Sequence, residues 1–269
     1  MIEWHKTFAA CCLLGLTTIV ASAAGQAAQY PVHQPVPGGI AVIEIGRTYS
    51  DGYQARFGRR PILVFERNGV WFGVVGIGLD TPLGDYLITV KTPENGSSLG
   101  FYVKPHSYPF RDDFSELGVP DDLNISLTWR SVLDASFPLI SPVKGTRVEK
   151  FGSRYEAEKD AKSVQWAVLS DIENNVVVAP GGGTIVDVLN NDGINYFLTI
   201  DHGMGLFSTV GPVRKIGKET GQPVKKGEAL GKLGIDTVRP HTLYWQVSLN
   251  GVAINPELVS DQLKGPEPE

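Results

Sequence analysis

Short runs of alternating apolar and polar residues, separated by glycine, proline and asparagine, fill most of this 269-residue chain. In the first group, Tyr86, Ile88 and Val90 recur at every second position, and Asn68-Gly69 separates two apolar runs. Alternation predicts strands with one buried face, and Asn-Gly is the strongest short signal for a hairpin turn. We therefore predict a small β-sandwich-like domain over residues 37–105.

A second group of strand-like runs covers residues 139–260. Its runs are short and end at glycine or asparagine turns, which is typical of a compact antiparallel domain. We predict an all-β fold class in which this second domain is an antiparallel β-barrel-like structure. Residues 106–138 are expected to be a linker with one short helix, around 121–133. The tail, residues 261–269, is charged and proline-containing and is expected to be disordered.

The N-terminal segment has a composition of its own. Lys6 precedes an apolar run over about residues 7–20, and small residues follow it. This pattern predicts a signal peptide over residues 1–24, followed by a flexible leader over 25–36. A retained N-terminal anchor is the alternative. Both cysteines lie inside the apolar run, so the exported chain would have neither a disulfide nor a thiolate.

The charge balance excludes one class of partner. The formal net charge is -5, the isoelectric point is near 5.6, and no basic run is longer than a pair such as Lys225-Lys226. Nucleic-acid binding needs clustered lysine and arginine, so we expect no nucleic-acid partner. No transmembrane span is expected once the signal peptide is removed.

Four blocks of sequence carry a family resemblance. They are "VVVAPGGGTIVDV", "LTIDHGMGLFSTVGPV", "GQPVKKGEALGKLG" and "LYWQVSLNGVAINP". In this order they resemble the LytM or M23 family of zinc metallopeptidases, which cleave peptide crosslinks in peptidoglycan. "PGGIAVI" and "WFGVVGIGLD" resemble the accessory β-domain that precedes M23 domains in some Gram-negative proteins. The resemblance implies an exported protein, most simply in the periplasm of a Gram-negative bacterium.

The chemistry of the family is not carried over with its fold. In active members, a histidine, an aspartate four residues later and the second histidine of H-x-H hold the zinc. Two more histidines assist the water and the transition state. Here H-x-H is replaced by Thr242-Leu243-Tyr244, and Pro212 stands at one assisting histidine.

The first half of the metal motif is also missing. Its alignment is uncertain by about two residues, yet no histidine lies between His106 and His202. The histidine position falls at Val164, Trp166 or Ala167, and the aspartate position at Val168, Ser170 or Asp171.

The remaining histidines do not rebuild a site. His202 lies in the "IDHG" turn, which the resemblance places away from the metal. His241 precedes Thr242, so strand alternation points it away from Thr242 and Tyr244. Because catalytic zinc needs three protein ligands and an open position, we expect neither zinc nor catalytic residues.

The substituted positions define a degenerate cleft that is a candidate for binding. Its residues are Trp166, Ser170, Asp171, Pro212, His241, Thr242 and Tyr244. Its aromatic rings could stack on sugar rings or anchor a partner's side chain. Alternatively they fill the space vacated by the metal, and Trp245 is expected on the opposite face of its strand.

Three functions stay open. The first is a non-catalytic envelope protein that regulates a peptidoglycan hydrolase or binds the cell wall through the former cleft. The second is an active zinc endopeptidase of peptidoglycan, which the missing ligands contradict. The third is a structural component of an envelope assembly. Peptidoglycan or a peptidoglycan hydrolase is the expected partner.

Overall fold

The computed structural model describes residues 29–48, 54–91, 95–111, 129–149, 151–156, 161–170, 175–190, 192–236 and 239–261. Every named element in these ranges is a strand, apart from the short 3-10 helix η1 (Pro256–Leu258). The all-β prediction is confirmed. The expected signal peptide and all but the first residue of the expected tail lie outside the described ranges. Within those ranges, no helix is long and apolar enough to cross a membrane.

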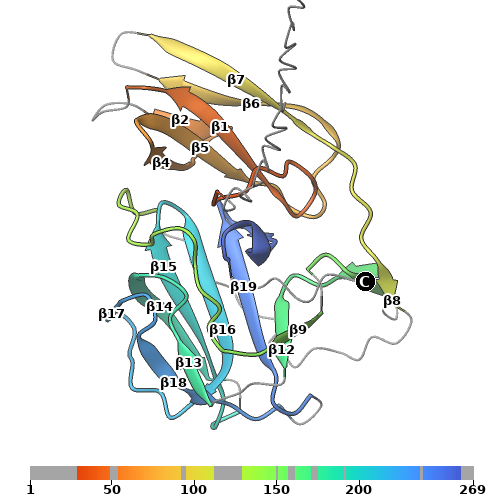
Figure 1. The fold of residues 1–269 in the computed structure, drawn as a ribbon, viewed down its shortest axis with the longest axis vertical. Helices are drawn as coiled ribbons and strands as arrows, with labels where there is room; N and C mark the ends of the chain where they lie inside the picture. Colours follow the sequence, from red (N-terminus) through yellow and green to blue (C-terminus); the bar gives the residue numbers. More distant parts are fainter. Residues whose placement is uncertain are drawn as a thin grey trace, which may run out of the picture.

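Two antiparallel sheets form the N-terminal domain, as predicted for a β-sandwich-like unit (Figure 1). The sheet of order β1-β5-β4 contains β1 (Ile40–Gly46), β4 (Leu63–Arg67) and β5 (Val70–Gly76). The sheet of order β3-β2-β6-β7 contains β2 (Gln54–Phe57), β3 (Arg60–Pro61), β6 (Gly84–Lys91) and β7 (Gly96–Val103). Side chains from both sheets, among them Val64, Val75 and Ile88, share one core.

The predicted hairpin at Asn68-Gly69 joins β4 to β5. Both residues have positive φ, 55° and 75°, and Arg67 pairs with Val70 across the turn. A two-residue turn of this kind needs positive φ at both positions, which asparagine and glycine tolerate best. This turn fixes the register of β4 and β5, in which the side chains of Val64 and Val74 lie on opposite sides of the sheet.

A ten-stranded sheet forms the second domain, with the main order β17-β14-β15-β16-β19-β12-β9. Its strands are β9 (Thr146–Glu149), β12 (Ala167–Ser170), β13 (Val176–Val178), β14 (Gly183–Asn190), β15 (Tyr196–Gly203), β16 (Leu206–Arg214), β17 (Pro223–Val224), β18 (Ala229–Leu233), β19 (Leu243–Leu249) and β20 (Val252–Ile254). All pairings in this sheet are antiparallel. Because β16 pairs with β18 as well as with β15 and β19, the sheet bends into the predicted barrel-like form.

The segment expected to be a linker is partly built into the fold. It contributes β8 (Phe110–Arg111), which runs parallel to β10 (Arg154–Glu156), and β10 pairs with β11 (Ala161–Ser163). Most of the expected helix falls on residues 112–128, outside the described part, and residues 129–133 are not helical.

Residues 129–139 pack on the second domain. The Asp134 N–H donates to the His202 carbonyl at 2.7 Å, and the Leu139 N–H donates to the Val259 carbonyl at 2.7 Å. Arg130 forms an ion pair with the buried Asp201 at 2.9 Å. The structure of the second domain therefore begins earlier along the chain than the pattern of strands indicates.

The leader expected over residues 25–36 is ordered in its second half, contrary to the prediction of flexibility. The Val32 N–H donates to the Leu258 carbonyl at 2.8 Å, and Gln34 forms a β-bridge with Ile40. Val36 is buried. These contacts satisfy backbone groups that an extended, solvated leader would leave to water.

The two domains share a hydrophobic core at their junction. Ile40, Leu63 and Val74 of the first domain belong to the same buried cluster as Leu249 and Ile254 of the second. In Figure 1, the end of β19 reaches the lower edge of the first domain. Apolar surface removed from water on both sides favours one fixed arrangement over free domain motion.

Asn250, at the turn between β19 and β20, adds polar contacts to this junction. Its side-chain Oδ1 accepts from the Gly76 N–H at 3.3 Å, and its Nδ2 donates to the Pro61 carbonyl at 3.2 Å. Its own carbonyl accepts from Arg60 Nη1 at 3.0 Å. The φ of Asn250 is 55°, and Gly251 follows with φ 85°. The turn of one domain is therefore bonded to two strands of the other.

His202 is fully buried and takes part in a neutral hydrogen-bond chain. Its Nδ1 lies 2.7 Å from the Gly182 carbonyl and its Nε2 lies 2.9 Å from Ser208 Oγ, which also accepts from Trp245 Nε1 at 3.3 Å. Since a carbonyl only accepts, Nδ1 carries the proton and Nε2 accepts from Ser208. Burial lowers the pKa of His202 to about 4. The ring shares the side of Trp245, opposite to Tyr244, as expected for a structural histidine.

We predict that Asn250→Ala lowers the free energy of unfolding by about 1–3 kcal/mol, because it removes two side-chain hydrogen bonds and places alanine at positive φ. Asn250→Gly is the matched control, since glycine tolerates that φ and loses only the hydrogen bonds. It should retain more stability than the alanine variant in urea denaturation. Equal stability of wild type and both variants would contradict the role given to Asn250.

We predict that His202 makes the fold less stable as the pH falls from 6.5 to 4. In the unfolded chain His202 binds a proton near pH 6.5, whereas the buried ring binds one only near about pH 4. The free energy of unfolding therefore falls by about 3 kcal/mol over this range, and the loss is complete below about pH 4. Denaturation of His202→Gln from pH 4 to 7.5 should lack this part of the slope. The exposed His241→Gln serves as control, and identical slopes in both variants would refute the assignment.

Candidate functional site

The face of the sheet on which the family's metal motif would lie is built by β12, β19 and β16. Val168 pairs with Tyr244 between β12 and β19, and Gly211 pairs with Tyr244 between β16 and β19. Side chains alternate along a strand, so Thr242 and Ser170 share this face with Tyr244 and Val168. The register brings the sequence-predicted positions of three strands together.

Trp166, Val168, Phe197 and Tyr244 form a separate buried cluster on this face, which we call the aromatic cluster. Trp166 is 7% exposed and Tyr244 is 0% exposed. The Trp166 and Phe197 rings meet edge to face, with centroids 6.1 Å apart at 76°. Leu189 packs against the cluster from β14. Of the two interpretations left open for the aromatic residues, the burial favours space filling over stacking on a ligand.

Tyr244 is held at its polar end as well as its ring. Its hydroxyl donates to Asp236 Oδ2, and Asp236 Oδ1 accepts from the Arg239 N–H at 2.9 Å. A buried tyrosine needs a partner for its hydroxyl, and the turn that precedes β19 supplies one. Tyr244, which the resemblance aligns with the second H-x-H histidine, is therefore a packed and hydrogen-bonded ring.

Gly211 and Pro212 complete the packing from β16. A Cβ on Gly211 would lie 2.4 Å from the Phe197 ring, so only glycine leaves room for that ring. Pro212 follows through a cis peptide bond and is buried. Pro212 offers no polar side-chain atom at the place where the resemblance puts an assisting histidine.

His241 and Thr242 differ in their surroundings. His241 is exposed and has φ 57°, whereas Thr242 is 3% exposed and its Oγ1 donates to the Pro240 carbonyl at 3.4 Å. Ser170 is half-buried at the end of β12. Asp171 lies outside the described residues. Ser170 and His241 are thus the cleft candidates with accessible surface.

The strand register narrows the alignment of the missing H-x-x-x-D motif. Ala167 and Leu169 belong to the main core on the other side of β12. Ala167 is therefore not on the face of Tyr244. Val164 with Val168, or Trp166 with Ser170, remain as the positions of the histidine and the aspartate.

The side chains present on this face do not fit zinc. Trp166 and Val168 offer no donor atom for the metal, and the Tyr244 hydroxyl is bonded to Asp236. In the described part of the chain, no three histidine, cysteine, aspartate or glutamate side chains lie close enough to hold a metal ion. The arrangement also offers no activated nucleophile, so its observable property is apolar packing.

Phe197, Leu189 and Asp236 were not predicted from the sequence. Phe197 lies in "INYFLTIDHG", whose alternation would assign it to one face without saying what covers that face. Asp236 lies eight residues before Tyr244, and no local spacing rule connects a turn carboxylate with a strand hydroxyl. Only the pairing of β15, β16 and β19 brings these residues together.

The chain was compared with known proteins. No curated protein matches its sequence. A Pseudomonas aeruginosa protein assigned to peptidase family M23 has a similar solved structure, with a TM-score of 0.66 and 24% identity, covering 85% of this chain and 96% of that one. That likeness concerns the fold.

Two further structures are more distant. A zinc-containing peptidase from Vibrio cholerae matches with a TM-score of 0.41 and 13% identity, covering 77% of this chain and 57% of that one. A chain of the SpoIIQ–SpoIIIAH pore-forming complex matches with a TM-score of 0.41 and 20% identity, covering 47% of this chain and 93% of that one.

Two family models match in the order in which the domains occur. The model for the peptidase family M23 N-terminal domain matches residues 33–106, and the model for peptidase family M23 matches residues 164–256. The first range covers the two-sheet domain, and the second covers most of the barrel-like sheet. The chain therefore contains a peptidase family M23 domain preceded by a peptidase family M23 N-terminal domain.

Proposed function

We propose that this protein is a non-catalytic M23-type protein of the bacterial envelope that acts by binding, either to a peptidoglycan hydrolase that it regulates or to the cell wall. The aromatic cluster is the observation that carries the proposal. Trp166, Val168 and Tyr244 occupy the face from which the family holds its zinc, and all three are buried.

In this proposal, side-chain packing removes the metal site together with the two changes at Thr242 and Tyr244. A zinc peptidase needs an open metal position for its water, whereas the Tyr244 ring lies between Val168 and Gly211 and its hydroxyl is bonded to Asp236. Rebuilding the site would require a cavity as well as ligands. The proposal accordingly includes the absence of zinc and of hydrolytic activity.

A partner that contacts the former cleft would meet its rim and not its aromatic rings. His241 is exposed and Ser170 is half-buried, while Trp166 and Tyr244 contribute almost no accessible surface. The periplasmic location in the proposal rests on the signal-like segment at 1–24 and on the family. Both expected partners, the wall and its hydrolases, occur there.

We predict that the purified protein holds no stoichiometric zinc and does not hydrolyse crosslinked muropeptides. The double variant Thr242→His/Tyr244→His should also be inactive, because Trp166, Val168 and Pro212 still deny the metal its remaining ligands. Metal analysis and product chromatography measure both properties. Circular dichroism checks that the variant is folded, and tightly held zinc in the wild type or hydrolysis by either protein would overturn the proposal.

We predict that binding to insoluble peptidoglycan, or to a peptidoglycan hydrolase of the same envelope, weakens about tenfold or more in His241→Asp. Aspartate is among the residues that tolerate positive φ, so the backbone at 57° is kept. Ser97→Asp, on the exposed edge strand β7, is the matched control and should bind normally. If the protein bound neither partner, the alternative function as a structural component of an envelope assembly would explain the result better. Equal loss of binding in His241→Asp and Ser97→Asp would exclude the rim of the former cleft as the binding surface.

A further inference from the structure

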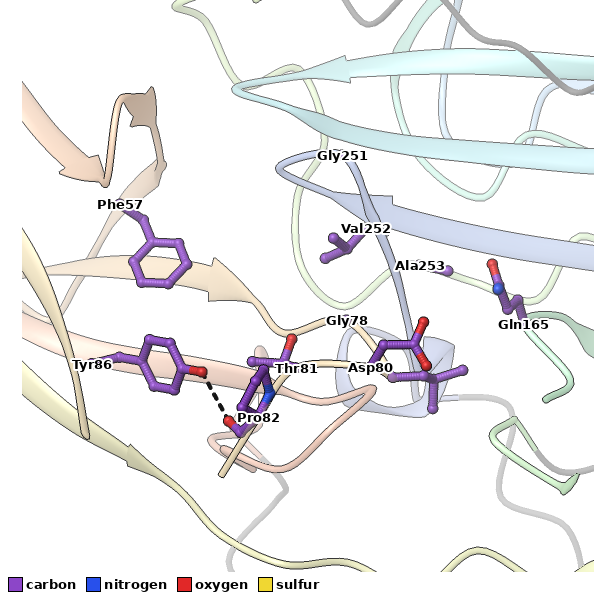
Figure 2. A pocket seen from close by; sticks show the side chains of 11 residues that line it. Phe57, Gly78, Asp80, Thr81, Pro82, Tyr86, Gln165, Gly251, Val252 and Ala253 are labelled. Carbon is purple, nitrogen blue, oxygen red and sulfur yellow. Dashed lines mark hydrogen bonds between the residues drawn. The ribbon is translucent and has the colours of Figure 1, made fainter. Parts of the chain in front are cut away.

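A pocket of about 580 Å³ lies between the two domains, and none of its lining residues belongs to the aromatic cluster (Figure 2). Pockets that hold small ligands or side chains are commonly about 300–1,000 Å³ and occur preferentially at domain interfaces. Its walls come from four places in the sequence: Phe57 on β2, the 78–82 loop with Tyr86 on β6, Gln165 before β12, and residues 251–253 around the start of β20. The pocket therefore exists only while the two domains are docked.

One wall is an aromatic surface of fixed geometry. The Phe57 and Tyr86 rings lie 5.9 Å apart at 56°, and Phe101 supports both, at 5.8 Å and 5.7 Å. The Tyr86 hydroxyl donates to the Pro82 carbonyl at 2.9 Å, which ties the ring to the loop and satisfies its polar end. Both rings are half-buried, so part of each faces the pocket. Rings that are held in place lose little entropy when a ligand binds.

The opposite side of the pocket supplies one negative charge. Asp80 is the only lining residue that is charged at neutral pH, and none of the lining residues is lysine, arginine or histidine. A turn closed by the Thr81 N–H and the Gly78 carbonyl, 3.1 Å apart, fixes its place. Asp80 is exposed, and the described residues give its carboxylate no hydrogen bond or ion pair.

The Asp80 carboxylate and the Phe57 and Tyr86 rings together favour a positively charged ligand. An anion would meet Asp80 without any compensating cation, whereas a cation would meet a carboxylate and the negative faces of two rings. An apolar stem leading to the charge would pack on Phe57 and on the half-buried Val252. Gln165 and Gly251 line the pocket and are exposed, so a peptide chain beside them can remain in solvent.

We propose that this pocket binds a peptide side chain that ends in a primary amine, such as lysine or another diamino acid. The ammonium group pairs with Asp80, and the methylene stem lies against Phe57 and Tyr86. The site is distinct from the former metal cleft, and it does not depend on whether that cleft binds anything.

The test measures binding of the blocked tripeptide acetyl-Ala-Lys-Ala-amide to the full chain by calorimetry and by chemical-shift mapping. The same peptide with norleucine, which has the stem without the amine, should bind about tenfold more weakly or worse, because it lacks the charge-assisted bond. Shifts should concentrate at residues 78–82 and 251–253. Raising the ionic strength should weaken the lysine peptide and not the norleucine peptide.

Variants of the protein separate the charge from the rings. Asp80→Asn should weaken binding of the lysine peptide about tenfold. Phe57→Leu keeps apolar volume but removes a π face, and it should weaken the same binding about threefold. Asp85→Asn is the matched control, since Asp85 is exposed on β6 but does not line the pocket. It should bind like wild type, and urea denaturation checks that all variants are folded.

Several outcomes would overturn the proposal. They are equal binding of the lysine and norleucine peptides, unchanged affinity in Asp80→Asn, and no saturable binding of the lysine peptide. Binding of a soluble chitin oligosaccharide at residues 78–82, independent of Asp80, would assign the pocket to a neutral sugar instead.

Discussion

The side chain of Tyr244 sets the character of one face of the second domain's sheet. Side chains alternate along a β-strand, and Tyr244 lies on the face opposite to the main core, in the aromatic cluster. Here that surface has acquired a core of its own. Val168 lies opposite the ring, Gly211 leaves space for Phe197 beneath it, and Asp236 accepts its hydroxyl. These contacts bring residues from β12, β15, β16 and β19 together in one cluster.

The main core lies on the other side of β19 and consists of apolar side chains. Leu243, Trp245 and Val247 face it, and Ser208 links the His202 ring to the Trp245 indole by hydrogen bonds. Desolvation by burial lowers the pKa of His202 and keeps the ring neutral. The neutral ring can accept a hydrogen bond from Ser208 at Nε2, which a charged imidazole could not. The domain is thus a sheet packed on both faces.

The sequence predicted the parts of this structure that depend on local pattern. Strand alternation and the Asn68-Gly69 turn both follow from neighbouring residues. It did not predict contacts that depend on distant pairing. Phe197 meets Tyr244 only through β16, and Val32 is ordered only because Leu258 returns to it.

The offset of the H-x-x-x-D motif shows the same limit. Sequence alone left Val164, Trp166 and Ala167 as equivalent choices for the histidine. The pairing of β12 with β19 removes Ala167, because Ala167 pairs with Trp245 and both face the main core. Side-chain orientation, which a one-residue shift reverses, was the missing information.

One strand connects the two sites of this molecule. β19 carries Tyr244, ends at Leu249, and leads through Asn250 and Gly251 into the wall of the pocket between the domains. Asn250 bonds this turn to the first domain, and the next residues, 251–253, line the pocket. Any ligand that binds the assembled pocket better than its separated halves stabilises the docked state by its differential affinity. Occupancy at the junction would therefore hold the first domain against the barrel and fix which surfaces of both domains a partner in the envelope can reach.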